Sequence, residues 1–375
     1  IKLKALGVNN FRILDPHPEL LCNWKWCTCN TKMRYLRSPG VHHVGLQPFD
    51  LHKYLSDKNS GNGNFRSPNK RPSLSLFNSH ADTQIQNHKL SNHHIQASAH
   101  TITLQRSGIH VQTDKELIAA KKLIFAVGRA GQLQWPEWAE KLKNRGASVN
   151  HVYGKTFDAN DIPNGSQITI LGGGQSGAQL ALGLSETHPG KITIITRTPF
   201  KSNNYDVPPG WMGPKFLQYF YQEPSYKIRR QMINEARNSG TMTPEIYRSL
   251  TKAIADKKIH HIIGEIDNAI LFSSNLIKLD FKNRESVGSN SIILATGFTE
   301  DRPGGILLDE LIENYNLRCA DCGYPILQPT LEWGHGIFVT GPLAELELGP
   351  ASPNIIGARH GGKRIERALK AHSSN

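Results

Sequence analysis

A glycine turn set between a strand and a helix constrains the fold of this chain more than any other feature. Residues 167–171 form a short apolar, β-branched run, which predicts a buried strand. The turn Gly172-Gly-Gly-Gln-Ser-Gly177 follows at once, residues 178–185 predict a helix, and residues 191–196 predict the next strand. This order of strand, glycine turn, helix and strand is typical of a βαβ unit that holds a dinucleotide.

The spacing of the glycines suits such a ligand. Gly172 permits the tight turn, Gly174 lets the main chain approach a diphosphate, and Gly177 lets helix and strand pack closely. The N-terminus of the helix that follows offers free N–H groups and a partial positive charge to phosphates, and Gln175 and Ser176 of the turn are expected at the cofactor as well. A glycine turn with a purely structural role is the alternative.

The residues after the second strand of this unit indicate which dinucleotide it binds. An NAD site would place an acidic side chain there, to hold the ribose hydroxyls. This chain has Arg197 instead, with Lys201 nearby, and cations at this point favour the 2′-phosphate of NADPH. A solvated surface arginine is the alternative.

The first part of the chain repeats the same pattern. Strand-like runs at 101–105 and 109–112 are followed by an apolar run that ends in Gly128, as the run at 291–297 ends in Thr296 and Gly297. The repeat predicts two related nucleotide-binding units, each with a β-meander, in an α/β fold.

The opening residues fit the first unit caught part-way. Residues 1–6 predict the end of a helix, Gly7 its C-cap, and residues 11–14 a strand closed by Asp15. A carboxylate at that position suits a ribose diol, as in an FAD or NAD site. An Asp that forms a turn before Pro16 is the alternative.

Composition excludes several classes of protein. The net charge of +13 is scattered, without a basic block, so we expect phosphorylated cofactors and not nucleic acid as the partner. No apolar run approaches the roughly 20 residues of a membrane span, and the first residues lack the apolar core of a signal peptide. Five cysteines do not suggest a disulfide framework, which favours a reducing cytoplasm.

Cys319-Ala-Asp-Cys322 is a C-x-x-C motif that predicts either a redox pair or two ordinary loop thiols. No second cysteine pair lies at a zinc-like spacing, and the paired histidines of the chain lack metal-ligand spacing. We therefore expect no metal site.

Two connecting segments have distinct compositions. Residues 56–72 predict a mobile loop. Residues 214–255 predict a mostly helical connection over the nucleotide unit, which carries Arg229, Arg230 and Arg237.

The chain resembles the lysine/ornithine N-monooxygenase-like family, within the class B flavoprotein monooxygenases. The resemblance covers nearly the whole length. It rests on residues 33–39 (Met-Arg-Tyr-Leu-Arg-Ser-Pro) with His42-His43, the turn at 172–177, residues 294–298 (Leu-Ala-Thr-Gly-Phe), residues 339–345 (Val-Thr-Gly-Pro-Leu-Ala-Glu), residues 348–350 (Leu-Gly-Pro) and residues 354–357 (Asn-Ile-Ile-Gly).

The resemblance implies an FAD- and NADPH-dependent monooxygenase. In this family NADPH reduces FAD, the reduced flavin captures O2 as a C4a-hydroperoxide, and a small nucleophile such as an amine takes one oxygen atom. Such an enzyme needs neither a metal nor a side-chain nucleophile, so no catalytic residue is assigned. Two alternatives stay open: a flavoprotein reductase that uses Cys319 and Cys322, and a non-catalytic NADP-binding homologue.

The resemblance also implies domains and site residues. Residues 1–160 and 285–375 form a discontinuous FAD domain, whose first strand and glycine turn are not in the sequence, and residues 161–284 form the inserted NADPH domain. Beyond the residues already named for the two units, the expected cofactor contacts are Leu36, Arg37, Ser38, His42, His43, Gly128, Thr296, Gly297, Gly341, Leu348, Gly349, Pro350 and Asn354.

Substrate contacts are expected from Arg66, Asp206 and Trp211. The segment 204–214 departs from the Asn- and Phe-containing stretch of the lysine and ornithine hydroxylases. The amino-acid substrate is therefore not carried over, and Trp211 has plain packing as its alternative role.

Overall fold

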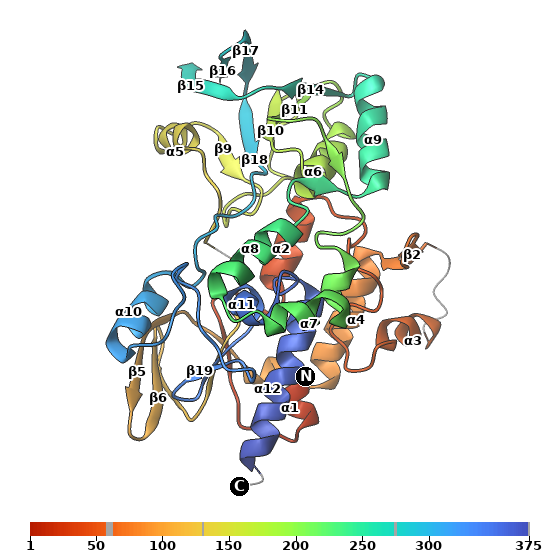
Figure 1. Ribbon diagram of the computed structural model, residues 1–375. Helices are drawn as coiled ribbons and strands as arrows, with labels where there is room; N and C mark the ends of the chain where they lie inside the picture. Colours follow the sequence, from red (N-terminus) through yellow and green to blue (C-terminus); the bar gives the residue numbers. More distant parts are fainter. Residues whose placement is uncertain (58–62, 130, 274–275, 374–375) are drawn as a thin grey trace.

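The computed structural model describes residues 1–57, 63–129, 131–273 and 276–373. The chain forms two α/β halves, one built around the glycine turn and the other from the two ends of the chain (Figure 1). No helix of the described residues is long and apolar enough to cross a membrane.

The nucleotide half contains a five-stranded parallel sheet in the order β14-β11-β10-β18-β9. Its strands are β9 (Val149–His151), β10 (Ile168–Leu171), β11 (Ile192–Thr196), β14 (Ile259–Ile263) and β18 (Ser291–Leu294). Most residues of the three inner strands β10, β11 and β18 are buried, as expected for a parallel sheet covered on both faces.

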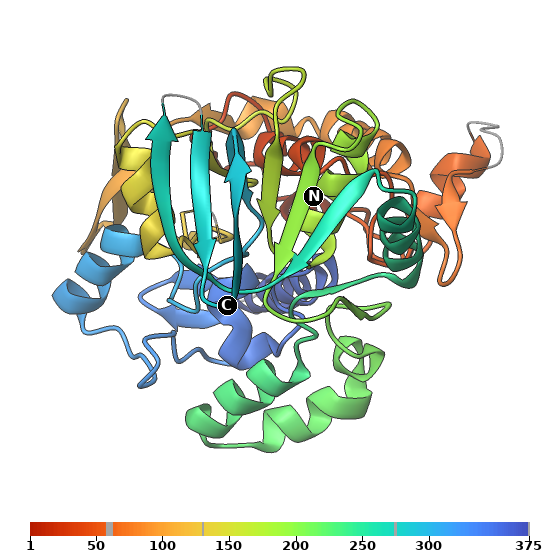
Figure 2. The same ribbon diagram turned by 90° about the horizontal axis from the view of Figure 1, so that it is seen from above.

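Helices α6 (Gln175–Ser185) and α9 (Pro244–Ala255) bury apolar side chains against one face of this sheet. Helix α5 (Glu137–Asn144) and an antiparallel meander cover the other face (Figure 2). The meander consists of β15 (Ile266–Ser273), β16 (Leu276–Phe281) and β17 (Arg284–Ser289). This is the meander that the sequence predicts for the unit, and residues 274–275 lie outside the described residues.

The domain boundaries expected after residues 160 and 284 cut through this sheet. Strand β9 precedes residue 160 and β18 follows residue 284, yet both pair within the sheet that contains β10. Parallel pairing between strands distant in the sequence brings them together, and no local signal marks it. Because α5 also packs on this sheet, we propose that the nucleotide half extends from about residue 137 to about residue 297.

The flavin half, as we name the other half, contains two separate parallel pairings. Strand β1 (Ile13–Asp15) pairs with β4 (His94–Gln96), and β8 (Leu123–Phe125) pairs with β20 (Ile337–Val339), which carries β19 (Glu332–Gly334) antiparallel on its other edge. A second meander consists of β5 (Ala99–Gln105), β6 (Gly108–Thr113) and β7 (Leu117–Ala120).

Helices surround these strands. The N-terminal α1 (Lys2–Ala5) lies beside the C-terminal α12 (Ile355–Ser373), and Lys2 donates to Glu366 across that contact (Figure 1). The core of this half joins the meander, β8, β20, α12 and α10 (Gly305–Tyr315). Its remaining helices are α2 (Cys22–Asn30), α3 (Asp50–Asp57), α4 (Leu74–Asn87), the 3-10 turns Leu90–His93 and Gly341–Ala344, and α11 (Glu345–Leu348).

Two connections differ from expectation. Part of the predicted loop at 56–72 is a short hairpin of β2 (Phe65–Arg66) and β3 (Arg71–Pro72), and residues 58–62 lie outside the described part of the chain. The segment 214–255 is helical as predicted, but α8 (Tyr226–Ala236), which follows α7 (Pro214–Gln222), contacts α11 of the flavin half. Helix α9 is the helix of this segment that covers the nucleotide sheet.

Candidate functional site

The glycine turn has the geometry that a diphosphate requires. Gly172 has φ +125°, and an added Cβ would lie 2.4 Å from the carbonyl oxygen of Ala295. An added Cβ at Gly177 would lie 2.2 Å from the carbonyl oxygen of Gly172, so no larger residue fits either position. These contacts press the turn against the strands and place the start of α6 at the carboxyl ends of β10 and β18.

Gly174 has a different role. An added Cβ there would meet nothing closer than 3.6 Å, the Cα of Gly240, so protein packing alone does not demand a glycine. Gly174 is the N-cap of α6 and provides no side-chain hydrogen bond, which leaves the first N–H groups of the helix open to an anion. The turn therefore fits a dinucleotide.

Arg197 occupies the position that the sequence analysis assigned to the 2′-phosphate. It follows β11 directly and is exposed, and its guanidinium has no hydrogen bond or ion pair within the described residues. Lys201 begins the short strand β12 (Lys201–Ser202) and is exposed as well. Two unengaged cations beside the end of β11 suit a dianionic phosphate.

The side chains of the turn itself face protein partners. The Ser176 hydroxyl lies 2.5 Å from the Tyr153 hydroxyl, and Gln175 Oε1 accepts from the main-chain N–H of Thr243 at 2.8 Å. The Tyr153 ring stacks on Phe298, and burial raises the pKa of Tyr153, which keeps its hydroxyl protonated. Gln175 and Ser176 thus shape the turn through protein contacts, and the main chain remains available to the ligand.

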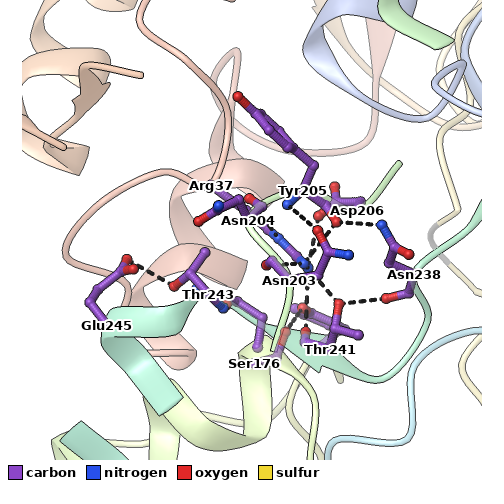
Figure 3. Close-up of polar contacts among 12 residues, drawn as sticks. Arg37, Ser176, Asn203, Asn204, Tyr205, Asp206, Asn238, Thr241, Thr243 and Glu245 are labelled. Carbon is purple, nitrogen blue, oxygen red and sulfur yellow. Dashed lines mark hydrogen bonds and ion pairs between the residues drawn. The ribbon is translucent and has the colours of Figure 1, made fainter. Parts of the chain in front are cut away.

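Arg37 projects from the flavin half into the nucleotide half (Figure 3). Its guanidinium donates to the carbonyl oxygens of Asn203 (2.8 Å), Tyr205 (3.0 Å) and Thr241 (3.3 Å), and pairs with Asp206 at 2.9 Å. The Arg37 side chain is thus engaged by the protein, and Arg37 holds one oxygen of Asp206. A cofactor contact of Arg37 and a substrate contact of Asp206 stay predictions.

A second arginine of the flavin half makes a similar contact. Arg71 is 3% exposed and pairs with Glu245 at 2.5 Å, while Glu245 also accepts from the Thr243 hydroxyl at 2.8 Å. The sequence gives no sign of this pair, since nothing near Arg71 or Glu245 marks one as the partner of the other.

Three glycines at strand ends leave open space where a side chain would project. Gly128, Gly297 and Gly341 have φ of +61°, +83° and +67°, and an added Cβ would meet no atom within 4 Å. Since β8 and β20 are parallel neighbours, Gly128 and Gly341 follow the same edge of one sheet. The hydroxyl of Thr340 beside them is buried without a partner in the described structure. These residues fit the flat ring system of a flavin.

Asp15 lies at the carboxyl end of β1, as expected. One carboxylate oxygen of Asp15 accepts from the His17 main-chain N–H at 2.9 Å and lies 2.7 Å from the ring Nδ1 of His17, while the other oxygen has no hydrogen bond within the described residues. Leu36 is buried and donates its N–H to Pro72, and Ser38 is half-buried. These positions agree with the prediction without testing it.

The neighbouring histidines His42 and His43 have different environments. The ring of His43 is fully buried, lies 3.0 Å from the Pro48 carbonyl oxygen through Nε2 and accepts from the Gly45 N–H through Nδ1. The His43 ring therefore stabilises its own loop, and its role at the cofactor stays a prediction. Burial, with a smaller effect from Arg359, lowers the pKa of His42 to about 4, so His42 is neutral at pH 7.

The segment after Gly341 is buried. An added Cβ at Gly349 would lie 2.9 Å from Leu217 of α7, so this glycine serves helix packing, and Leu348 and Pro350 are buried beside it. Thr296 donates its hydroxyl to the Gln134 carbonyl oxygen. Asn354 is half-buried and immediately precedes α12. The contacts that the structure shows for Gly349 and Thr296 are with the protein, and their contacts with the cofactor stay predictions.

Glu345, named before only within a motif, is the centre of a buried charge cluster. Its carboxylate is fully buried and pairs with Arg129 (3.3 Å), Arg230 and Arg237. Burial by itself would raise the pKa of Glu345, but Arg237 and Arg230 outweigh it and hold the pKa below its usual value. The cluster joins α8 to α11 and to the loop after β8.

The three substrate candidates each have a structural partner. Trp211 packs against the rings of Phe216 and Phe220, with centroid distances of 5.6 and 5.9 Å, so its packing role is the one observed. The guanidinium of Arg66 lies 4.4 Å from the centre of the Tyr35 ring on the exposed hairpin. Among the described residues, no hydrogen bond, ion pair or ring contact joins Arg66, Asp206 and Trp211 to one another.

Cys319 and Cys322 are free thiols. They lie on a tight turn that is closed by an antiparallel main-chain β-bridge between Cys319 and Pro325. Burial raises the pKa of Cys319, which opposes the thiolate that a redox pair requires. Within the described residues, no group of three or more His, Cys, Asp or Glu side chains could hold a metal ion.

Residues 79–300 match the model of the family described as L-lysine 6-monooxygenase/L-ornithine 5-monooxygenase. The chain belongs to this family. Family membership confirms the expected resemblance and identifies the protein as a monooxygenase, and therefore as an oxidoreductase. No curated protein sequence matches the chain.

Solved structures show the same fold over almost the whole length. The ornithine hydroxylase PvdA from Pseudomonas aeruginosa has a TM-score of 0.76 and 15% identity, with 99% of this chain and 94% of that chain covered. The FAD-bound cadaverine monooxygenase DfoA from Erwinia amylovora has a TM-score of 0.74 and 13% identity, with 99% and 91% covered. These matches confirm the two-domain flavoprotein fold.

The bacillithiol disulfide reductase from Staphylococcus aureus also has this fold, with a TM-score of 0.64 and 14% identity over 99% of this chain and 93% of that one. The fold is thus shared between monooxygenases and reductases. The family match, and not the fold, separates the two functions for this protein.

Proposed function

We propose that the protein is an NADPH- and FAD-dependent monooxygenase of the cytoplasm that uses O2 to oxygenate a small nucleophile, most simply by N-hydroxylation of an amine. The observation that carries this proposal is the turn at 172–177, where two glycines are required by packing and Gly174 is left free for a ligand. Membership of the lysine and ornithine monooxygenase family supports the same chemistry.

The residues of each half have separate tasks in this proposal. The first N–H groups of α6 bind the diphosphate of NADPH, and Arg197 binds its 2′-phosphate. The open positions at Gly128 and Gly341 admit the flavin ring, and Asp15 binds a ribose diol with its second oxygen. When bound, FAD passes electrons from NADPH to O2 and delivers one oxygen atom to the substrate.

The exclusion of water is the other task of the protein, because a closed site would keep water away from the reaction that bound FAD would supply. Arg37 and Arg71 hold the halves together through contacts that are half-buried or buried. Tyr153, stacked on Phe298, fills the space beside the turn. In this proposal the protein binds and orients the cofactors and excludes water from the site, and no side chain attacks the substrate.

The proposal is tested with purified protein supplied with FAD. NADPH oxidation and O2 uptake are measured with a panel of primary amines, including lysine, ornithine and cadaverine, and with sulfur compounds. We expect one or more amines to raise both rates and to gain one oxygen atom by mass spectrometry. NADPH oxidation that no compound of either class changes would contradict the proposal.

A further inference from the structure

Two loops of the nucleotide half, residues 203–206 and 238–243, form one polar unit beside the glycine turn. Strand β12 pairs in parallel with β13 (Thr241–Met242), and the N–H of Asn238 donates to the Asp206 carbonyl oxygen at 2.7 Å. The Asn238 side chain donates to Tyr205, and the Thr241 hydroxyl donates to the Asn238 carbonyl oxygen (Figure 3). We call this unit the paired loops.

The paired loops contact the glycine turn directly. The Cα of Gly240 is the atom nearest to the Cβ position of Gly174, at 3.6 Å. The next residue of the glycine turn, Gln175, makes a second contact: its Oε1 atom accepts a hydrogen bond from the main-chain N–H of Thr243 at 2.8 Å. A shift of the paired loops would therefore change the space above the first N–H groups of α6.

Arg37 of the flavin half forms hydrogen bonds with both of the paired loops. Its Nη2 atom contacts the carbonyl oxygens of Asn203 and Tyr205 on one loop and the Thr241 hydroxyl (2.8 Å) on the other. Its side chain is 14% exposed, and Asp206 balances its charge. A planar guanidinium can serve several acceptors in fixed directions, which the ammonium of lysine cannot do.

We propose that Arg37 is a positioning residue that orders the paired loops and thereby sets the dinucleotide turn relative to the flavin half. The proposal rests on the function proposed above, since it assigns Arg37 a part in the alignment of NADPH with the flavin. Arg37 acts through the paired loops and touches neither cofactor in this proposal. A misplacement of about 1 Å is enough to slow a reaction about 100-fold.

The chain offers a matched control. Arg34, three positions earlier, also pairs across the two halves, with Glu186 at 2.6 Å, but its side chain is 71% exposed and that of Glu186 is 61% exposed. An exposed pair of this kind contributes little to position or stability. Arg34→Gln therefore removes an arginine and an interdomain ion pair without disturbing the paired loops.

The test compares Arg37→Lys, Asp206→Asn and Arg34→Gln in the full chain by hydrogen exchange and by anaerobic flavin reduction with saturating NADPH. For Arg37→Lys we expect faster exchange confined to residues 203–206 and 238–243, and reduction slowed about 10- to 100-fold. Asp206→Asn keeps the carbonyl acceptors and should give a smaller effect in the same segments. Arg34→Gln should match the wild type in both measurements.

Two outcomes would overturn the proposal: unchanged exchange in both loops of Arg37→Lys, or exchange raised evenly along the whole chain, which would make Arg37 a stability residue only. A wild-type protein whose flavin is not reduced by NADPH would instead defeat the proposed function. The exchange pattern would still decide the role of Arg37 in that case, because it needs no cofactor. Reduction by dithionite, which bypasses NADPH, should be equal in all variants.

Discussion

Arg71 and Glu245 form a buried ion pair between the two halves, with 2.5 Å between Nη1 and Oε1. Burial favours the protonated form of Glu245, but hydrogen bonds from Arg71 and Thr243 outweigh it and hold the pKa of the carboxyl below its usual value. The pair therefore stabilises the protein above the ordinary pKa of a glutamate, and this contribution is lost as the pH falls through the lowered value.

We expect Glu245→Gln to lower the free energy of unfolding by about 3 kcal/mol, because it leaves the charge of Arg71 buried without its partner. Urea unfolding followed by circular dichroism measures the change. Glu186→Gln removes an exposed partner of Arg34 and should cost less than about 1 kcal/mol. Equal losses in the two variants would show that the burial of the pair does not matter.

Two glycines of the turn should respond differently to alanine. Gly177→Ala forces a Cβ to within 2.2 Å of the Gly172 carbonyl oxygen, so we expect loss of stability and of NADP+ binding together. Gly174→Ala meets no atom within 3.5 Å, so the melting temperature should stay within a few degrees while NADP+ binding weakens about 10-fold or more. Calorimetric titration with NADP+ and thermal unfolding separate the two effects. Tight NADP+ binding by Gly174→Ala would remove the turn from the ligand site.

Arg197→Ala should weaken NADPH binding about 10-fold and leave NADH binding unchanged, because only NADPH carries the 2′-phosphate. The ratio of kcat/KM for the two nucleotides measures this selectivity. Arg248→Ala removes an exposed arginine from α9 and should leave the ratio unchanged. A selectivity that survives Arg197→Ala would assign the phosphate to another cation.

The free energy of unfolding should fall in acid, because several histidines are buried in their neutral form. Burial lowers the pKa of His42, His80 and His151 from 6.5 to about 4. The folded protein therefore favours the neutral rings, and this stabilisation is complete above about pH 6.5 and is lost as the pH falls toward 4. The loss is on the order of 3 kcal/mol for each ring at pH 4.

His80→Leu isolates one of these rings. Neither ring nitrogen of His80 has a hydrogen-bond partner in the described structure, so leucine breaks no such bond. We expect the unfolding free energy of this variant to depend less steeply on pH between 6.5 and 4, by up to one proton. His260→Leu changes an exposed histidine and should keep the wild-type slope. Identical slopes for wild type and His80→Leu would refute the assignment.

Glu345→Gln should be among the most destabilising single substitutions, because three arginines lose the buried carboxylate that they share. The expected loss is about 3–5 kcal/mol. Hydrogen exchange should rise first in α8, whose Arg230 and Arg237 lose their partner. Protection of α8 that equals the wild type would show that apolar packing alone holds this helix.

The sequence alone determined the features that depend on neighbouring residues. A strand, the glycines at 172, 174 and 177, and a helix must follow one another to form a phosphate-binding turn, so their order in the chain reveals it. Strands β8 and β18, which Gly128 and Gly297 follow, could be predicted from the sequence for the same reason, as could Asp15 at the end of β1.

Only the tertiary structure decided which side chains meet across the two halves. Arg37 reaches Tyr205 over 168 positions of sequence, and Glu345 meets Arg129 over 216. The strength of such contacts depends on how far burial excludes water from the partners, and burial is a property of the folded chain. The sequence could therefore predict the dinucleotide turn, while the contacts that join the two halves required the fold.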